Sequence, residues 1–331
     1  MPESRIKIGV IGVGRMGTYH ANVLSILNHY VDFVGVYDID LDRARTIATK
    51  YNTVSYKKVD DLLSVADGVC IAVPTRAHYD VAKRALEAGV HTLVEKPIAC
   101  SIEEATALIE LAEKMGLVFQ VGHVERFKGA VIELKKIVHN PYLVEARRLS
   151  PWMNKDWDTG VVLDLMIHDI DIVLSLVKSK PVHIEAAGKI IKSKYEDVAT
   201  AVLQFENGAI ASITASRLSE IRLRRMTVSQ KNGFILLDFE SQDIDIHRRA
   251  SASFYVFPSE ITYKQEFIVE KVKVQKENAL KEELLHFAKC IIGEEEPIVK
   301  GEDDIKTLEV TLRIIESINK KIGKPGHYIS T

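Results

Sequence analysis

Short apolar runs alternate with amphipathic segments through the first third of the chain. Runs of strand length lie at 5–12, 31–38, 68–73, 91–96 and 117–122. Between them, apolar residues recur at helical spacing, most clearly over 76–88 and 102–115. Strands that alternate with helices predict a parallel, doubly wound sheet, whose ligands bind beyond the carboxyl ends of its strands.

Beyond about residue 120 the pattern becomes that of an α+β domain. A strand-like run at 142–150 leads into an apolar helix, and many strand-like runs follow between 182 and 276. The triplets ENG (206–208) and KNG (231–233) are typical of hairpin turns, so these runs predict a large, mostly antiparallel sheet. Further helices are predicted at 278–292 and 304–322.

The large sheet is expected to carry its helices mainly on one side. Strands such as AIASITAS have few charged residues for a solvated face. We therefore predict that the open face is an oligomer interface. A face covered within the monomer is the alternative.

The stretch GVGRMG (12–17) follows the first apolar run and opens a helical segment, which is the context of a dinucleotide-binding turn. Gly12 permits the tight turn, Gly14 lets a pyrophosphate approach the backbone, and Gly17 lets the helix pack on the sheet. Asp38 ends the second strand, where a carboxylate accepts hydrogen bonds from a ribose 2′-OH and repels a 2′-phosphate. The sequence therefore predicts a Rossmann domain that binds NAD in preference to NADP.

We expect this Rossmann domain to span residues 1–122 and a substrate-binding and oligomerisation domain to span 123–331. Three stretches lie beyond predicted strand ends, namely PTRAH (74–78), EKP (95–97) and GHVERF (122–127). The predicted cofactor-binding residues come from the glycine-rich turn, the second strand and these ends: Gly12, Val13, Gly14, Arg15, Met16, Gly17, Asp38, Val73, Pro74, Thr75, His78, Glu95, Lys96 and Pro97.

The run DLMIHDID (164–171) places four ionisable residues in an otherwise apolar helix. Residues four and seven apart share a helix face, so Asp164, His168 and Asp171 are expected to align while Asp169 points elsewhere. A carboxylate one turn before a histidine can fix its tautomer for acid–base chemistry, although a hydrogen-bonded core patch is the alternative. Lys96 favours the catalytic interpretation, because a lysine and a histidine can together move a hydroxyl proton while hydride leaves the same carbon.

Composition narrows the class of protein. The 331 residues carry a formal net charge of −2 and are 47% hydrophobic, so neither a nucleic-acid nor a membrane partner is favoured. No apolar run is long enough to span a bilayer. The three cysteines are far apart and the eleven histidines form no ligand cluster, so we expect no metal and a reduced, cytoplasmic compartment.

Taken in order, GVGRMG, AVPTRAH, EKP, GHVERF and DLMIHDID resemble the glucose–fructose oxidoreductase/inositol dehydrogenase/MocA (Gfo/Idh/MocA) family over essentially the whole chain. The resemblance implies a Rossmann domain, an α/β domain with a large open sheet, homodimers or homotetramers joined through that sheet, and oxidation of sugars or polyols with NAD or NADP. By motif, Lys96 matches the catalytic lysine, His168 the catalytic histidine, and Asp164 the acid that helps to bind the reacting hydroxyl. Asp169 and Asp171 are assigned to structure or orientation.

Within the family, residues 121–138 and 214–239 look similar to UDP-N-acetylglucosamine 3-dehydrogenases. A nucleotide-sugar carries a diphosphate, for which Arg126 and Arg217 are candidate cations, and Arg126 is preferred because its motif lies at the crevice. Further candidate cations are Arg147, Arg148, Arg222, Arg224 and Arg225. For each arginine of the set, a surface residue without a ligand is the alternative. The predicted substrate-binding set is Lys96, His123, Arg126, Trp152, Asn154, Asp164, His168 and Arg217. The chain departs from the subfamily at Lys128 and Gly129, where members often carry Asn-Pro.

Three functions follow from the resemblance. The first is a dehydrogenase for a nucleotide-sugar, most of all the 3-hydroxyl of UDP-N-acetylglucosamine. The second is an inositol or free-sugar dehydrogenase of the same family. The third is a non-catalytic NAD-binding regulator, against which the presence of both Lys96 and His168 argues.

Overall fold

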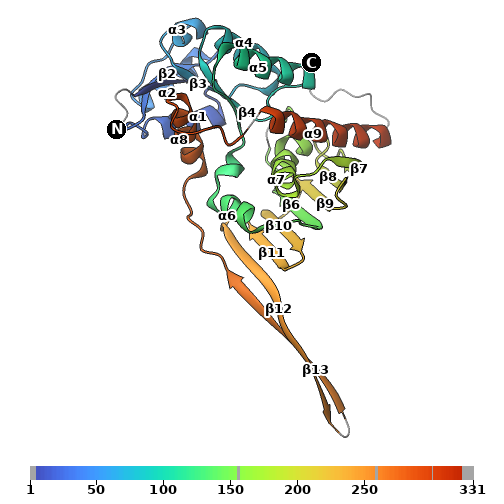
Figure 1. Cartoon of the computed structure of the whole chain (residues 1–331). Coiled ribbons are helices and arrows are strands. Elements are labelled where there is room, and N and C mark those ends of the chain that lie inside the picture. Colours follow the sequence, from blue (N-terminus) through green and yellow to red (C-terminus); the bar gives the residue numbers. More distant parts are fainter. Residues whose placement is uncertain (1–4, 155–156, 258–259, 300, 323–331) are drawn as a thin grey trace. The chain divides into compact units, whose positions relative to one another are not determined.

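The computed structural model describes residues 5–154, 157–257, 260–299 and 301–322 (Figure 1). The chain forms two compact units. Of the described residues, the first unit contains 5–127, 277–299 and 301–309, and the second contains 128–154, 157–257, 260–276 and 310–322. Among the described residues, no helix is both long and apolar enough to cross a membrane.

The first unit is built on a five-stranded sheet with the order β2-β1-β3-β4-β5, and every neighbouring pair is parallel. The strands are β1 (Ile6–Ile11), β2 (Val31–Tyr37), β3 (Gly68–Ile71), β4 (His91–Glu95) and β5 (Phe119–Gly122). The helices are α1 (Arg15–Leu24), α2 (Leu41–Lys50), α3 (Val59–Leu63), η1 (Thr75–Ala77), α4 (His78–Glu87), α5 (Ile102–Met115), η2 (Val124–Phe127) and α8 (Ala279–Ile291). The predicted doubly wound parallel sheet is confirmed.

The core of this unit joins distant parts of the chain. Ile8 and Val10 of β1 are fully buried, as expected for a continuous apolar strand covered on both faces. Leu284 and Phe287 of α8 lie in the same core, so a helix near the end of the chain completes the packing of the first unit.

The second unit contains an eight-stranded sheet with the order β13-β12-β11-β10-β6-β9-β8-β7. Only the β6–β9 pair is parallel among these neighbours, so the predicted mostly antiparallel sheet is confirmed. The strands are β6 (Leu143–Leu149), β7 (Pro181–Lys189), β8 (Val198–Phe205), β9 (Ile210–Ser216), β10 (Leu223–Gln230), β11 (Gly233–Asp238), β12 (Asp243–Phe257) and β13 (Glu260–Lys271). The helical elements that follow Phe127 in the chain, apart from α8, are α6 (Gly129–Ile137), η3 (Val162–Met166), α7 (Ile167–Val177) and α9 (Gly301–Ile322).

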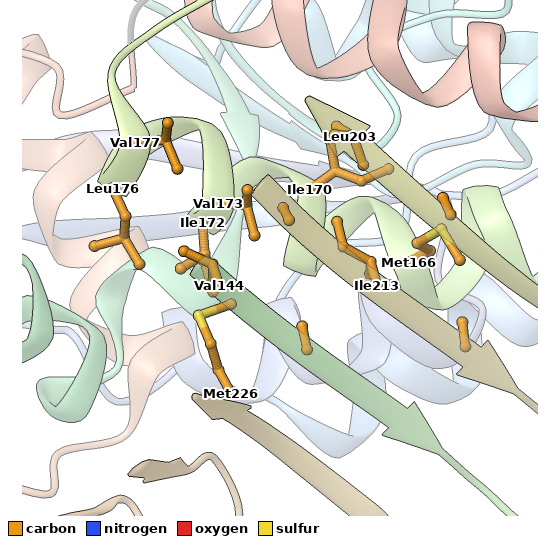
Figure 2. Packing of buried hydrophobic residues seen from close by; sticks show 14 of the residues in the cluster. Val144, Met166, Ile170, Ile172, Val173, Leu176, Val177, Leu203, Ile213 and Met226 are labelled. Atoms are coloured by element: carbon orange, nitrogen blue, oxygen red, sulfur yellow. The ribbon is translucent and has the colours of Figure 1, made fainter. Parts of the chain in front are cut away.

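Helix α7 packs on this sheet through a tight apolar layer (Figure 2). Ile170 and Val173 of the helix lie in one cluster with Val144, Ile213 and Met226 of the strands, and all five are fully buried. Close packing of this kind fixes the rotation of the helix, because turning it would open cavities in the layer. The sheet therefore determines which side chains of DLMIHDID face away from the core.

Candidate active site

The strands of the first unit end in register. Ile11 pairs with Tyr37 and with Ile71, and Ile71 pairs with Val94. The chain leaves each strand immediately afterwards, so one edge of the sheet gathers the expected cofactor residues: Gly12, Val13, Asp38, Val73, Glu95 and Lys96. This edge is the carboxyl end of a parallel sheet, where open α/β folds bind their ligands.

The turn between β1 and α1 needs its glycines for different reasons. Gly12 has a φ of +84°, and a Cβ there would lie 2.8 Å from the Ala72 carbonyl oxygen. A Cβ on Gly17 would lie 1.8 Å from the Gly12 oxygen, so the helix packs against the turn itself. A Cβ on Gly14 would meet nothing within 4 Å. Open space over Gly14 and the first N–H groups of α1, from Arg15 onward, fit the pyrophosphate of a dinucleotide.

Asp38 follows β2 and is nearly buried, with 5% of its surface exposed. One of its carboxylate oxygens accepts a 2.7 Å hydrogen bond from the Val13 N–H, and the other accepts one of 2.8 Å from the Asp40 N–H. The guanidinium of Arg43 lies 3.6 Å from the same carboxylate and also pairs with Asp40. The acid thus ties the end of β2 to the glycine-rich turn.

His78, the first residue of α4, connects two of the predicted cofactor loops. Its ring nitrogens lie 2.8 Å from the Pro97 carbonyl oxygen and 2.9 Å from the Val73 carbonyl oxygen. Burial lowers the pKa of His78, and the two carbonyl groups oppose this shift. The histidine therefore holds the loop at 73–75 against EKP (95–97). Its role is to support the structure of the cofactor edge.

Glu95 of EKP is held from inside the unit. Its carboxylate lies 2.7 Å from Nε2 of His20 on α1, and both side chains are largely buried. Burial acts to raise the pKa of Glu95, but the hydrogen bond to His20 and the charges of His20 and Lys96 lower it below its ordinary value. Lys96 is half-buried and directly follows this anchored residue.

The second unit presents the predicted acid–base pair. Asp164 and His168 are half-buried, whereas Asp169 and Asp171 are almost fully buried. Asp164 lies in η3, a π-helical turn that precedes α7. A π-turn adds one residue to the helical repeat, so the regular α-helical spacing that we assumed for this run does not hold through Asp164.

Asp169 has a structural partner. Its carboxylate accepts two hydrogen bonds from Arg148 of β6, at 3.0 and 2.8 Å, and each side chain is 2% exposed. The Arg148 guanidinium also lies over the ring of Phe239. This two-point ion pair fixes α7 to the sheet one residue after His168.

The two candidates from GHVERF are buried in the first unit. Nε2 of His123 lies 3.0 Å from the carboxylate of Asp304, and both side chains are 3% exposed. The guanidinium of Arg126 lies 3.5 Å from Asp303. In this structure both side chains therefore contact the acidic start of α9.

The remaining substrate candidates differ in exposure. Asn154 is exposed and Trp152 is half-buried, with its ring 6.0 Å from that of Trp157. Lys155 and Asp156 of the same loop lie outside the described residues. Arg217 is fully buried. The other arginines of the set are half-buried or exposed, apart from the buried Arg148: Arg147, Arg222, Arg224 and Arg225.

The departure at Lys128 and Gly129 has a local packing reason. A Cβ on Gly129 would lie 1.9 Å from the carbonyl oxygen of Gln275. Lys128 precedes α6, and its ammonium donates a 3.1 Å hydrogen bond to the Phe239 carbonyl oxygen. Both residues are thus adapted to the chain that passes over the start of α6.

Four supporting residues were not found from the sequence: His20, Glu283, Trp157 and Glu196. His20 had a detectable signal, because it recurs with Gly17 and Leu24 on the buried face of α1. Glu283 likewise shares the buried face of α8 with Phe287. Trp157 and Glu196 carry no such signal, since their partners are distant in sequence.

Comparisons with known proteins agree with this geometry. A family model described as "Oxidoreductase family, NAD-binding Rossmann fold" matches residues 6–123. A second model, the GFO/IDH/MocA C-terminal domain, matches residues 128–236. The two matches divide the chain at the same place as the two compact units.

Individual relatives cover nearly the whole chain. The UDP-N-acetylglucosamine 3-dehydrogenase of Acidithiobacillus ferrooxidans is 32% identical over 93% of this chain and 96% of its own length. The scyllo-inositol 2-dehydrogenase (NAD(+)) of Bacillus subtilis is 27% identical over 95% of this chain and 94% of its own. A solved structure of the Acidithiobacillus enzyme superposes with a TM-score of 0.87 at 31% identity, covering 96% of this chain and 99% of that one.

Proposed function

The chain belongs to the Gfo/Idh/MocA family of oxidoreductases, and we propose that it is an NAD-dependent dehydrogenase for the 3-hydroxyl of UDP-N-acetylglucosamine. One observation carries this choice of substrate. The chain is 32% identical, over 93% of its length, to a UDP-N-acetylglucosamine 3-dehydrogenase. The residues that the chemistry needs are present as Lys96, Asp164 and His168.

NAD is the proposed cofactor because of the carboxylate at the end of β2. Asp38 accepts hydrogen bonds at the glycine-rich turn, so its charge lies where a 2′-phosphate would be repelled. Arg43, the nearby cation, is already engaged by Asp38 and Asp40. The nicotinamide ring, when bound, accepts the hydride from the substrate carbon.

The proposed reaction divides its work among three side chains. Lys96 donates a hydrogen bond to the reacting oxygen, His168 removes the hydroxyl proton, and Asp164 orients the hydroxyl. The secondary alcohol loses one hydride and one proton and becomes a ketone, so charge and electrons balance. Glu95, fixed by His20, anchors the backbone that presents Lys96.

We assign substrate contacts outside the reacting centre to the loop before η3. Asn154 is exposed and Trp152 is half-buried, so both are accessible to a sugar or a base. An aromatic ring suits either partner, since it packs on apolar faces and leaves polar edges free. His123 and Arg126, which follow β5 in the first unit, contact Asp304 and Asp303.

The open face of the large sheet is proposed as the contact between copies of the chain, in a homodimer or homotetramer. Val202 of β8, Ile210 of β9 and Phe234 of β11 are 37–40% exposed on these strands. Exposed apolar residues on a sheet are typical of a surface that a second subunit covers. Light scattering coupled to size exclusion would test this, and a Val202→Asp variant should shift the mass toward a monomer.

A second candidate is oxidation of a free polyol, which the similarity to a scyllo-inositol 2-dehydrogenase over 95% of the chain favours. A non-catalytic regulator is disfavoured, because it has no need of Lys96 and His168 together. The same enzyme assay separates these candidates.

The test is to identify the product. Protein and NAD⁺ are incubated with UDP-N-acetylglucosamine, UDP-glucose, myo-inositol or glucose, and the ketone is reduced in place with borodeuteride. We expect deuterium at C3 of the amino sugar only, and none with a Lys96→Met variant. Deuterium in a polyol instead would select the second candidate, and none in any compound would overturn the proposal.

A further inference from the structure

Arg217 lies inside the second unit. It follows β9 and is 0% exposed. Its backbone N–H donates a 3.0 Å hydrogen bond to the Asp197 carbonyl oxygen, which continues the pairing of β8 with β9 and points the side chain inward. The guanidinium lies 4.1 Å from the centre of the Trp157 ring, so the aromatic face covers it.

The guanidinium holds the chain that leads into the π-turn. One of its nitrogens donates hydrogen bonds to the Thr159 carbonyl oxygen at 2.8 Å and to the Glu196 carbonyl oxygen at 3.3 Å. Arg217 also lies 3.5 Å from the Asp197 carboxylate. Its other two nitrogens, Nε and Nη1, are buried without a hydrogen-bond partner among the residues that the structure describes, so the Nη2 hydrogen bonds and the charge of Asp197 are what restrain the guanidinium.

Glu196 supplies the cap for the first turn. Its carbonyl oxygen accepts a 3.0 Å hydrogen bond from the Val161 N–H, and its carboxylate accepts one of 3.2 Å from the Val162 N–H. A Cβ on Gly160 would lie 1.8 Å from this carboxylate, so only glycine lets Glu196 reach the helix. The turn that carries Asp164 is therefore shaped by a residue of the loop before β8, whose backbone carbonyl Arg217 holds in place.

Arg217 also interacts with Asp164 through charge. Burial lowers the pKa of the Arg217 guanidinium, and among the carboxylates that oppose this shift the contribution of Asp164 is the largest, ahead of Asp197. Charges interact more strongly in the interior than in water. The same cation therefore contacts the backbone before η3 and attracts the carboxylate within it.

We propose that Arg217 is a positioning residue that orients Asp164 and the π-turn toward the reacting hydroxyl, and that it does not bind the substrate diphosphate. This inference rests on the proposed function, in which Asp164 contacts that hydroxyl. Trp157, stacked on the guanidinium, extends the same support to the loop of Trp152.

A double-mutant cycle on kcat tests the inference. Arg217→Met, Asp164→Asn and the double variant are compared with the wild type for turnover of UDP-N-acetylglucosamine. If Arg217 acts through Asp164, the two changes are coupled. The fall in kcat caused by Arg217→Met should then be about tenfold smaller in the Asp164→Asn background than in the wild type. The Kd for UDP should change less than kcat does, because Arg217 is fully buried and acts on the reacting centre through Asp164.

Two further variants make the result independent of folding. Arg217→Lys keeps the charge and should recover part of the kcat that Arg217→Met loses, and the cycle is run with it if Arg217→Met does not fold. Arg148→Met is the matched control, since it removes a buried arginine that pairs with Asp169. The fold-reduction in kcat of the double variant Arg148→Met/Asp164→Asn should equal the product of the two single fold-reductions, because the two residues act independently.

Contrary results are equally specific. If the fold-reductions in kcat of Arg217→Met and Asp164→Asn simply multiply in the double variant, the inference is overturned. It is also overturned if the Kd for UDP rises more than kcat falls, because Arg217 would then bind the ligand. Failure of the proposed function appears separately, as a wild type without turnover. The same double-mutant cycle is then measured on the free energy of unfolding in urea. Coupling between Arg217 and Asp164 would support their interaction, and additive losses would overturn it.

Discussion

The carboxylate of Glu95 lies 2.7 Å from the imidazole of His20, inside the first unit and one residue before Lys96. A second acid, Glu283 of α8, is 1% exposed, and its pKa is raised by burial and by the charge of Glu95. Within the described part of the chain, neither carboxylate oxygen of Glu283 has a hydrogen-bond partner. The first unit thus buries one acid that is paired with a histidine and one acid whose pKa burial raises.

This arrangement makes stability depend on pH through Glu283. Burial, and then the charge of Glu95, raises the pKa of Glu283 well above its ordinary value of 4.5. Between the ordinary and the raised pKa the folded chain binds more protons than the unfolded chain, so the free energy of unfolding falls as pH rises. Glu283→Gln should remove this fall and stabilise the protein at the upper end of the window.

Urea unfolding of Glu283→Gln across that window measures the effect. The control is Glu282→Gln, on the same turn of α8 but only half-buried, which should leave the pH dependence of the wild type unchanged. An unchanged pH dependence in Glu283→Gln would show that Glu283 is hydrated or paired in solution.

Cofactor preference should depend on Asp38. Asp38→Ala removes a charged hydrogen-bond acceptor. A hydrogen bond to a charged group contributes about 1.5–3 kcal/mol to binding, so NADH should bind at least tenfold more weakly. NADPH affinity should fall less, because the repulsion of its 2′-phosphate is removed as well. Fluorescence titration gives both values, and an equal fall in both would contradict the assigned 2′-OH contact.

Asp40→Ala is the matched control for this experiment. Asp40 caps α2 by accepting a 3.0 Å hydrogen bond from the Arg43 N–H. Its loss should lower the free energy of unfolding by about 1 kcal/mol and leave the affinity for NADH unchanged.

The ion pair between Arg148 and Asp169 should be structural. Arg148→Met or Asp169→Asn leaves a buried group unpaired and should cost about 3–5 kcal/mol of unfolding free energy. The double variant Arg148→Met/Asp169→Leu should lose less than either single change, because both charges are gone. A double variant that loses the sum of the two would contradict this role.

Lys96 and His168 should affect the chemical step more than binding. Lys96→Met should lower single-turnover hydride transfer by about 10²–10⁴-fold and leave the Kd for NAD nearly unchanged. His168→Ala should slow the same step while the Kd for the substrate changes little. Lys96→Arg tests whether charge alone suffices, and retained turnover in Lys96→Met would remove the lysine from the mechanism.

Local signals were enough to predict the parallel sheet and its glycine-rich turn. Gly12 and Gly17 have steric requirements that arise within the β1–α1 unit, and Asp38 contacts Val13 of that unit. Strands of both sheets were likewise predicted, because the spacing of apolar residues along a strand is a local signal.

The parts that the sequence did not predict depend on distant partners. The π-turn around Asp164 is capped by Glu196, and the buried pair of His123 and Asp304 joins residues far apart in the chain. Amphipathic spacing identifies α8 as a helix, yet it does not indicate which core receives Phe287. Such choices are made by tertiary packing, which a single sequence does not display.

The central claim is that hydride leaves C3 of UDP-N-acetylglucosamine in a step that uses Lys96. The most direct measurement is single-turnover NADH fluorescence with UDP-N-acetylglucosamine that carries deuterium at C3, compared with the undeuterated sugar and with the sugar deuterated at C2. We expect a slower signal only for deuterium at C3, and almost no signal for any of the three with Lys96→Met. Equal rates for all three sugars, or NADH formation that persists in Lys96→Met, would contradict the account.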